Sequence, residues 1–231
     1  MSIAENIARV RANIAAAAKE ARREASEVTL VGASKMNDAE ACRAAIAAGI
    51  DALGENREQE MTKKLAEHAY DGAPLHFIGH LQRNKVKNVV GKVALLESVG
   101  SLELLAAVDK QAEKLQIVQD ILLEVNIGGE EAKSGFAPEA LAQAAQEAKK
   151  CENVRVRGLM CIPPVAEGEH GSLPYFEKVH ALFVDINAKL YDNTLDILSM
   201  GMSGDYEDAV RAGATMVRVG TAIFGARNYT N

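Results

Sequence analysis

The sequence predicts one α/β domain, a TIM-type (β/α)8 barrel preceded by an extra N-terminal helix. Eight short apolar segments alternate with helical patterns, and neither a linker nor a low-complexity stretch divides residues 1–231. A length of 231 residues suits a single barrel of this kind. A doubly wound open sheet is the alternative, and the count of eight strand-like segments disfavours it.

The predicted elements follow one another in a regular order. Residues 2–24 are expected to form an amphipathic helix, because Ile3, Ile7, Val10 and Ile14 recur at helical spacing. The predicted strands are residues 28–34, 52–54, 75–78, 94–97, 121–127, 156–161, 197–200 and 216–219. Several are apolar on both faces, as expected of strands that lie between a filled barrel interior and outer helices.

Helical patterns lie between the predicted strands. Residues 38–48 end before Gly49, which can terminate a helix, and residues 138–150 begin with a proline, which the first helical turn tolerates. Residues 171–190 and 205–212 complete the set.

Charge and composition exclude several classes of protein. The net charge is −6 and the basic residues are scattered, so the sequence lacks the basic surface of a nucleic-acid-binding protein. No apolar run approaches the roughly 20 residues that span a bilayer, and the N-terminus has no signal-peptide pattern. Cys42, Cys151 and Cys161 show no CxxC spacing, which favours reduced thiols. We therefore expect a cytoplasmic protein without membrane or nucleic-acid partners.

The functional groups of a TIM-type barrel gather at the carboxyl ends of its strands, and Lys35 ends the first predicted strand. Strand alternation puts Thr29, Val31 and Ala33 on one face with Lys35, and the small Ala33 leaves room for a flat ligand. A lysine desolvated in a barrel mouth is a nucleophile toward aldehydes. The alternative is a solvated lysine at a strand end, which is the commoner situation in proteins.

The last predicted strand is followed by Gly220 and Thr221. Their backbone N–H groups could bind phosphate, as the loop after strand eight commonly does in this fold, or the glycine could simply serve a turn. Arg218 points to the face opposite Val217 and Val219, and so toward the mouth.

The seventh predicted strand ends near Ser199, Met200 and Ser203. Ser203 could cap the helix predicted at 205–212 or donate its hydroxyl to a phosphate, and Met200 is more typical of core packing than of ligand contact. His76 and His80 do not have the spacing of a metal site at a strand end, so no metal is predicted.

Six stretches of sequence stand out by their order and spacing: VGASK ending at Lys35, GENREQE around Asn56, HFIGHLQRNK at 76–85, EVNIGGEEAKSG at 124–135, RGLMCIP at 157–163 and LSMGMSGDYEDAVRAGATMVRVGTAIFGARNY at 198–229. With them, nearly the whole chain resembles the pyridoxal phosphate homeostasis protein family. The resemblance implies a barrel like that of alanine racemase, and a role in vitamin B6 and amino-acid homeostasis without established catalysis.

The resemblance also implies how the residues would contact pyridoxal 5′-phosphate. Lys35 would form a Schiff base with the cofactor, Asn56 would lie beside its ring, and Arg218 would face the ring nitrogen. Ser203, Gly220 and Thr221 would hold the phosphate, with Ser199 and Met200 nearby.

Three functions remain open at this point. The first is a monomeric holder of the cofactor that serves apo-enzymes as acceptors. It is favoured because an arginine leaves the ring nitrogen unprotonated, which makes the ring a weak electron sink. The second is a small amino-acid racemase, which needs a second base; alanine racemases complete that site with a partner subunit and a C-terminal β domain, and we expect neither here. The third is an aldolase that uses Lys35 without a cofactor.

Overall fold

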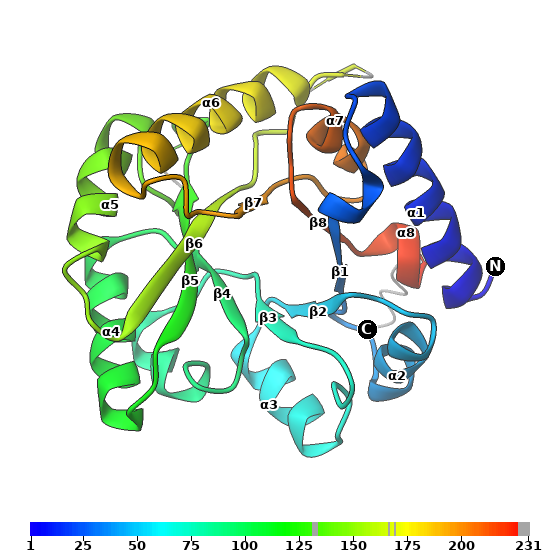
Figure 1. Cartoon of the computed structure of the whole chain (residues 1–231). Coiled ribbons are helices and arrows are strands. Elements are labelled where there is room, and N and C mark those ends of the chain that lie inside the picture. The colour runs from blue at the N-terminus through cyan, green and yellow to red at the C-terminus, as the bar shows by residue number, and fades with distance from the viewer. Residues whose placement is uncertain (131–133, 166, 169, 226–231) are drawn as a thin grey trace.

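Eight parallel strands close into a barrel in the computed structural model, which describes residues 1–130, 134–165, 167–168 and 170–225 (Figure 1). Each strand pairs with its neighbours in chain order, and β8 pairs with β1 to complete the circle. The predicted barrel is confirmed, and the open-sheet alternative is wrong. Residues 131–133 and 226–229, which belong to two of the stretches quoted above, lie outside the described residues.

All the predicted strands are present, with ends that differ by one or two residues. They are β1 (Thr29–Ala33), β2 (Ala52–Glu55), β3 (Leu75–Phe77), β4 (Leu95–Val99), β5 (Gln119–Val125), β6 (Val154–Cys161), β7 (Ile197–Ser199) and β8 (Met216–Val219). The predicted first strand included residue 34 and placed Lys35 as its last residue, whereas β1 ends at Ala33 because the chain then enters a turn.

The helices cover the outside of the barrel. The α-helices are α1 (Ile3–Glu20), α2 (Ala39–Ala47), α3 (Glu58–Ala66), α4 (Leu102–Leu115), α5 (Leu141–Ala148), α6 (Leu173–Leu190), α7 (Tyr206–Arg211) and α8 (Thr221–Phe224); the short 3-10 segments are η1 (Ala25–Glu27), η2 (Arg83–Asn88) and η3 (Pro138–Ala140). The first helix was predicted to reach residue 24. It ends at Glu20, since Arg22 takes a left-handed φ of 56°.

The extra helix α1 covers the side of the barrel where the first and last strands meet (Figure 1). It packs against α2, α7 and α8. Asn13 Nδ2 donates to the Tyr206 hydroxyl at 2.9 Å, and Asn6 Nδ2 donates to the Ile223 carbonyl at 2.8 Å. Because α8 has only four residues, α1 supplies the cover that an eighth outer helix gives in a regular barrel.

The barrel interior contains a small apolar cluster, which is separate from the core between strands and helices. Its buried members are Val31, Ala52, Leu95, Leu122, Met160 and Met216. Alternate residues such as Leu30 and Val217 face the outer helices. Both faces of these strands are therefore buried, as the apolar sequence pattern predicted.

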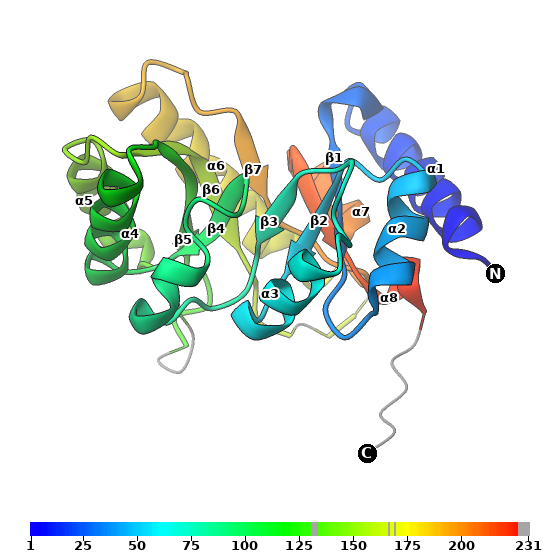
Figure 2. The ribbon, with the colours of Figure 1, turned by 90° about the horizontal axis from the view of Figure 1, so that it is seen from below.

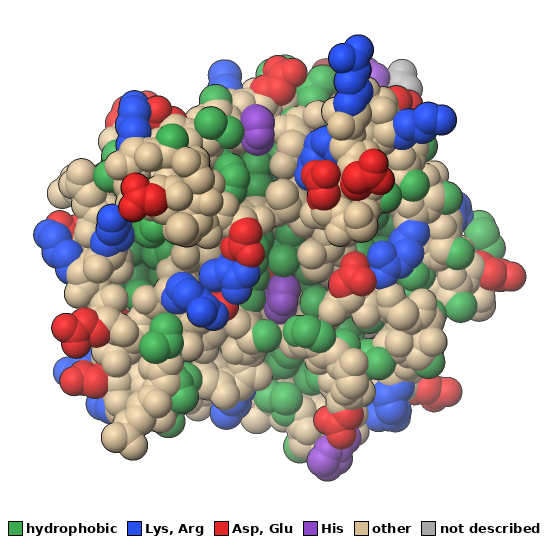
Figure 3. Space-filling view, viewed as in Figure 1, with side chains coloured by type: hydrophobic (Ala, Val, Ile, Leu, Met, Phe, Trp, Pro, Cys, Tyr) green, Lys and Arg blue, Asp and Glu red, His purple; other side chains and the backbone are tan. Residues whose placement is uncertain are grey.

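The two ends of the barrel differ. The carboxyl ends of the strands lie toward the bottom of Figure 2, on the side of α8, and we call this end the mouth. Figure 3 shows the opposite end, where charged side chains of both signs are interspersed. There Arg155 and Arg157 donate to Asp120 at 2.7 and 2.8 Å, and Arg157 also pairs with Asp196. In the described part of the chain, no helix combines the length and apolar character needed to cross a membrane.

Gly158 offers a test of the barrel packing. A Cβ at this position would lie 1.7 Å from the carbonyl oxygen of Ile197 on the adjacent strand. We expect Gly158→Ala to lower the free energy of unfolding by about 3–5 kcal/mol, because the backbone of β6 or β7 must move. Gly204→Ala is the matched control, since nothing lies within 4 Å of its Cβ position. Urea denaturation of both variants makes the comparison, and equal stability of the two would contradict the packing described.

Candidate functional site

The turn that follows β1 carries Lys35. The Asn37 N–H donates to the Ser34 carbonyl at 3.0 Å, and Met36 takes a φ of 63°. Ser34 is fully buried, Lys35 is half-buried and Met36 is exposed. Val31 lies in the interior cluster, which confirms that the strand face shared by Val31 and Ala33 is the interior one. Lys35 thus lies two residues after the end of β1, at the mouth of the barrel.

Arg218 lies on the interior face of β8 and is buried, with 3% of its surface exposed. Its guanidinium donates to Ser199 Oγ at 2.6 Å and to the Cys161 carbonyl at 2.9 Å. Ser199 Oγ in turn donates to Glu97 Oε2 at 2.6 Å, and Glu97 Oε1 lies 2.8 Å from His76 Nδ1. We call these four side chains, Arg218, Ser199, Glu97 and His76, the interior polar chain.

The interior polar chain keeps Glu97 ionised. Burial acts to raise the pKa of Glu97, but the hydrogen bond and charge of His76, the charge of Arg218 and the hydrogen bond from Ser199 outweigh it and lower the pKa. A carboxylate thus balances the Arg218 cation inside the barrel, with their nearest atoms 4.0 Å apart. Ser199 and Met200 are themselves fully buried, and Met200 packs in the main core.

Backbone donors converge after β8. The N–H groups of Gly220 and Ala222 donate to Ser203 Oγ at 3.1 and 3.3 Å. The sequence predicts that the N–H groups of Gly220 and Thr221 bind phosphate, and this stays a prediction; Thr221 is exposed at the first position of α8. Ser203 was also considered as the cap of the next helix, but Asp205 occupies the N-cap of α7.

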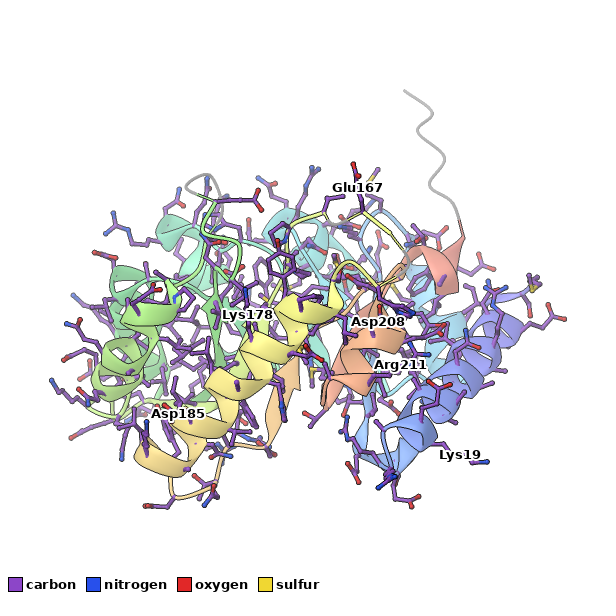
Figure 4. All side chains as sticks on the ribbon, turned by 90° about the horizontal axis from the view of Figure 1, so that it is seen from above. Lys19, Glu167, Lys178, Asp185, Asp208 and Arg211 are labelled. Carbon is purple, nitrogen blue, oxygen red and sulfur yellow. The ribbon has the colours of Figure 1, made fainter. Side chains whose placement is uncertain are left out.

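Helix α7 begins at Tyr206, three residues after Ser203. Figure 4 labels Asp208 and Arg211 on this helix, whose side chains pair at 2.9 Å. Arg211 also donates to Glu20 of α1 at 2.7 Å, and His170 Nδ1 lies 2.9 Å from Asp208 Oδ1. Helix α7 is thereby tied to α1 and to the segment that carries His170.

The pairing of β8 with β1 brings these groups together. Arg218 is opposite Val31 in the register, and a Cβ on Gly220 would lie 3.3 Å from the Ala33 carbonyl. The lysine turn and the donor pair of α8 therefore leave adjacent strands at the same end. Asn56, which follows β2, has a buried Oδ1 atom without a hydrogen-bond partner.

Across the mouth, Glu124 extends from the interior face of β5. It is 6% exposed, and its Oε2 atom has no hydrogen-bond partner. Burial raises the pKa of Glu124, opposed by Ser134, Arg218 and His80. A cavity of about 630 Å³ lies on this side, lined by residues that include His80, Arg83, Ser98, Ser101, Ser134 and Gly135.

Comparison with known proteins relates this chain to one family model and to several full-length relatives. The alanine racemase N-terminal domain family matches residues 6–228. Proteins called pyridoxal phosphate homeostasis protein in Aquifex aeolicus and Pseudomonas aeruginosa are each 42% identical to this chain over 99% of it, and over 100% and 97% of their own lengths. This chain belongs to the pyridoxal phosphate homeostasis protein family.

Solved structures agree with this membership. PipY of Synechococcus elongatus, a structure described as having PLP bound, is 31% identical, covers 97% of this chain and 100% of its own, and superposes with a TM-score of 0.84. Alanine racemase of Clostridium difficile is 18% identical, with a TM-score of 0.72 over 99% of this chain and 58% of its own. The second likeness shows the shared barrel fold alone.

Sequence reasoning missed the roles of three side chains in this family member. Glu97 was read as the end of an apolar strand, although a carboxylate inside LLESV is a signal that it needs a buried partner. Lys64 is one of the basic residues that the sequence analysis treated only as scattered charge, but it is 4% exposed. His76 was considered only as a metal ligand, and it instead bonds to Glu97.

Glu97 gives a prediction about pH. Its folded-state pKa lies below the ordinary value of 4.5, so its stabilising contribution is present above pH 4.5 and is lost as the pH falls through the folded pKa. We expect Glu97→Gln to lower the free energy of unfolding by roughly 2–4 kcal/mol at pH 7. The difference from wild type should shrink below pH 4.5. Denaturant unfolding across pH 3–7 measures this difference, with Glu113→Gln at an exposed position as control; a difference that does not change with pH would contradict the ionised state.

Proposed function

We propose that this protein binds pyridoxal 5′-phosphate covalently through Lys35 and acts as a non-catalytic holder of the cofactor in vitamin B6 and amino-acid homeostasis. Membership of the family named above supports the link to this cofactor. The observation that carries the proposal is the meeting of a lysine turn, a buried arginine and a convergent donor pair at the β8–β1 seam.

The residues at the seam fit the chemical parts of the cofactor. The N–H groups of Gly220 and Ala222 donate to Ser203 Oγ in this structure, and a bound phosphate would accept from them in its place, with the hydroxyls of Ser203 and Thr221 as further donors. Arg218 would donate to the ring nitrogen, and the unpartnered Asn56 Oδ1 would lie beside the ring. When bound, the cofactor supplies an aldehyde that combines with a primary amine.

The same arrangement argues against efficient carbanion chemistry. Arg218 can only donate hydrogen bonds, because a guanidinium is always charged, and one of them goes to Ser199, which in turn donates to Glu97. A ring nitrogen that faces this cation stays unprotonated, and an unprotonated ring withdraws electrons weakly. These groups therefore support binding rather than turnover.

We further propose a cellular location and a class of partner for this protein. Its cysteines, Cys42, Cys151 and Cys161, are free thiols, which supports a reducing cytoplasm. We propose a monomer that passes its cofactor to apo-enzymes. Faster activation of an apo-enzyme by the loaded protein than by free cofactor at equal concentration tests the transfer.

A racemase is the alternative, and Glu124 is the observation that favours it. This reaction needs a second base opposite Lys35, and a buried carboxyl with a raised pKa across the mouth is a candidate. Loss of deuterium from the Cα of labelled amino acids, abolished by Glu124→Gln, would support the enzyme over the holder.

Lys35 is the first target for mutation. We expect Lys35→Ala to abolish the visible absorption of the cofactor-loaded protein while the thermal unfolding temperature stays near that of wild type, because Lys35 is half-buried in a turn. Borohydride reduction of loaded wild type, followed by peptide mapping, identifies the modified residue. Modification of a lysine other than Lys35 would overturn the assignment.

Ser203 tests the phosphate contact. A hydrogen bond to a charged group contributes about 1.5–3 kcal/mol, so Ser203→Ala should weaken cofactor binding by roughly tenfold or more. Pyridoxal, which lacks the phosphate, should bind wild type and variant about equally. Met202→Ala is the neighbouring control at an exposed position. An equal loss of affinity for both ligands would show that Ser203 supports the loop and not the phosphate.

A further inference from the structure

Behind the Lys35 turn lies an ion cluster that consists of Glu55, Glu60 and Lys64, of which Glu55 and Lys64 are buried and Glu60 is half-buried. Glu55 ends β2 and is fully buried, while Glu60 and Lys64 lie one helical turn apart on α3. The Lys64 ammonium donates to Glu55 Oε1 and to Glu60 Oε1, both at 2.7 Å. The cluster also receives the Tyr70 hydroxyl, which donates to Glu55 Oε1 at 2.9 Å.

Lys64 is a second amine close to the site, and its surroundings keep it chemically inert. Its third hydrogen bond goes to the Ser34 carbonyl at 2.8 Å, so all three ammonium donors are used. Burial acts to lower the pKa of Lys64, but the hydrogen bonds and charges of Glu55 and Glu60 outweigh it and raise the pKa. A protonated, fully bonded amine does not attack an aldehyde.

The cluster also forms hydrogen bonds with Ser34 and Met36, the residues on either side of Lys35. On one side, Ser34 donates its hydroxyl to Glu55 Oε1 at 2.6 Å while its carbonyl accepts from Lys64. On the other side, the Met36 N–H donates to Glu60 Oε1 at 2.5 Å. Met36 holds a φ of 63°, which a side-chain-bearing residue adopts only when its surroundings impose it.

We infer that Lys64 and Glu60 are positioning residues that fix the backbone on either side of Lys35 and so direct its amine, rather than that of Lys64, to the cofactor aldehyde. The inference rests on the proposed attachment at Lys35. It deepens that proposal, because the ion cluster lies behind the turn and supplies no contact with the ligand itself.

Glu60 offers the sharper test, because it can be changed without leaving a buried charge alone. Glu60→Gln keeps an oxygen for the Met36 N–H, and Glu60→Leu removes it. For Glu60→Leu we expect amide exchange at Met36 to quicken about tenfold in the cofactor-free protein, and attachment of pyridoxal 5′-phosphate to slow about tenfold. For Glu60→Gln both rates should stay within about threefold of wild type. Visible circular dichroism of the bound cofactor should change only for Glu60→Leu.

Lys64→Met is the second variant, with Lys63→Met as its matched control. Lys63 is the preceding residue on the same helix, and its side chain is 78% exposed. We expect attachment to slow about tenfold or more for Lys64→Met and to be unchanged for Lys63→Met. If Lys64→Met fails to fold, the Glu60 pair decides the question.

The outcomes separate this inference from the proposed function. Wild-type attachment rates and circular dichroism in Glu60→Leu would overturn the positioning. If wild-type protein does not bind the cofactor at all, the proposed function fails, and amide exchange still reports on the turn. Unchanged exchange at Met36 in Glu60→Leu would then show that the ion cluster does not hold it.

Discussion

Closure of the sheet between β8 and β1 is the constraint on which the candidate site depends. Lys35 and Arg218 are separated by most of the chain, and the parallel pairing that sets Arg218 opposite Val31 brings the end of β8 beside the end of β1, which Lys35 follows. The close approach of Gly220 to Ala33 then lets the donors of α8 open onto the same end. The candidate binding groups at the β8–β1 seam therefore depend on this one pairing. Helix α1 covers this side of the barrel by packing against α2, α7 and α8.

Much of this arrangement could be predicted from the sequence, because strands buried on both faces leave a plain apolar signature. Alternation along VTLVGASK and MVRVG correctly placed Val31 and Arg218 on the interior face, since a period of two residues is a local property. A strand end in a barrel of this type also defines where ligands bind, so candidate residues could be named before any coordinates. Their contacts with a cofactor stay predictions.

The buried ionic groups could not be predicted, because each depends on a partner far along the chain. Lys64 meets Ser34, and Glu97 meets Ser199; nothing in the local sequence marks either pair. The end of β1 was misjudged for the same reason, since the left-handed Met36 is held by Glu60 on a later helix. Ser203 had a good local reason to cap α7, but it instead accepts hydrogen bonds from α8. A buried charge needs an opposite charge or hydrogen-bond partners, and the fold can supply these from any part of the chain.

The two strands of the seam, β1 and β8, lie near opposite ends of the sequence, and this separation affects how the molecule folds. Contacts between β1 and β8 have a very large sequence separation, so the entropy of closing that loop is lost before the contacts form. During synthesis, α1 and β1 emerge first and must wait for β8 and α7 before their apolar faces are covered. Until β8 pairs with it, one edge of β1 has no strand partner, and an unpaired edge is open to association with other chains. A barrel without β8 lacks Arg218 and Gly220 at the candidate site, so only the closed barrel has all the groups that are proposed to hold the ligand.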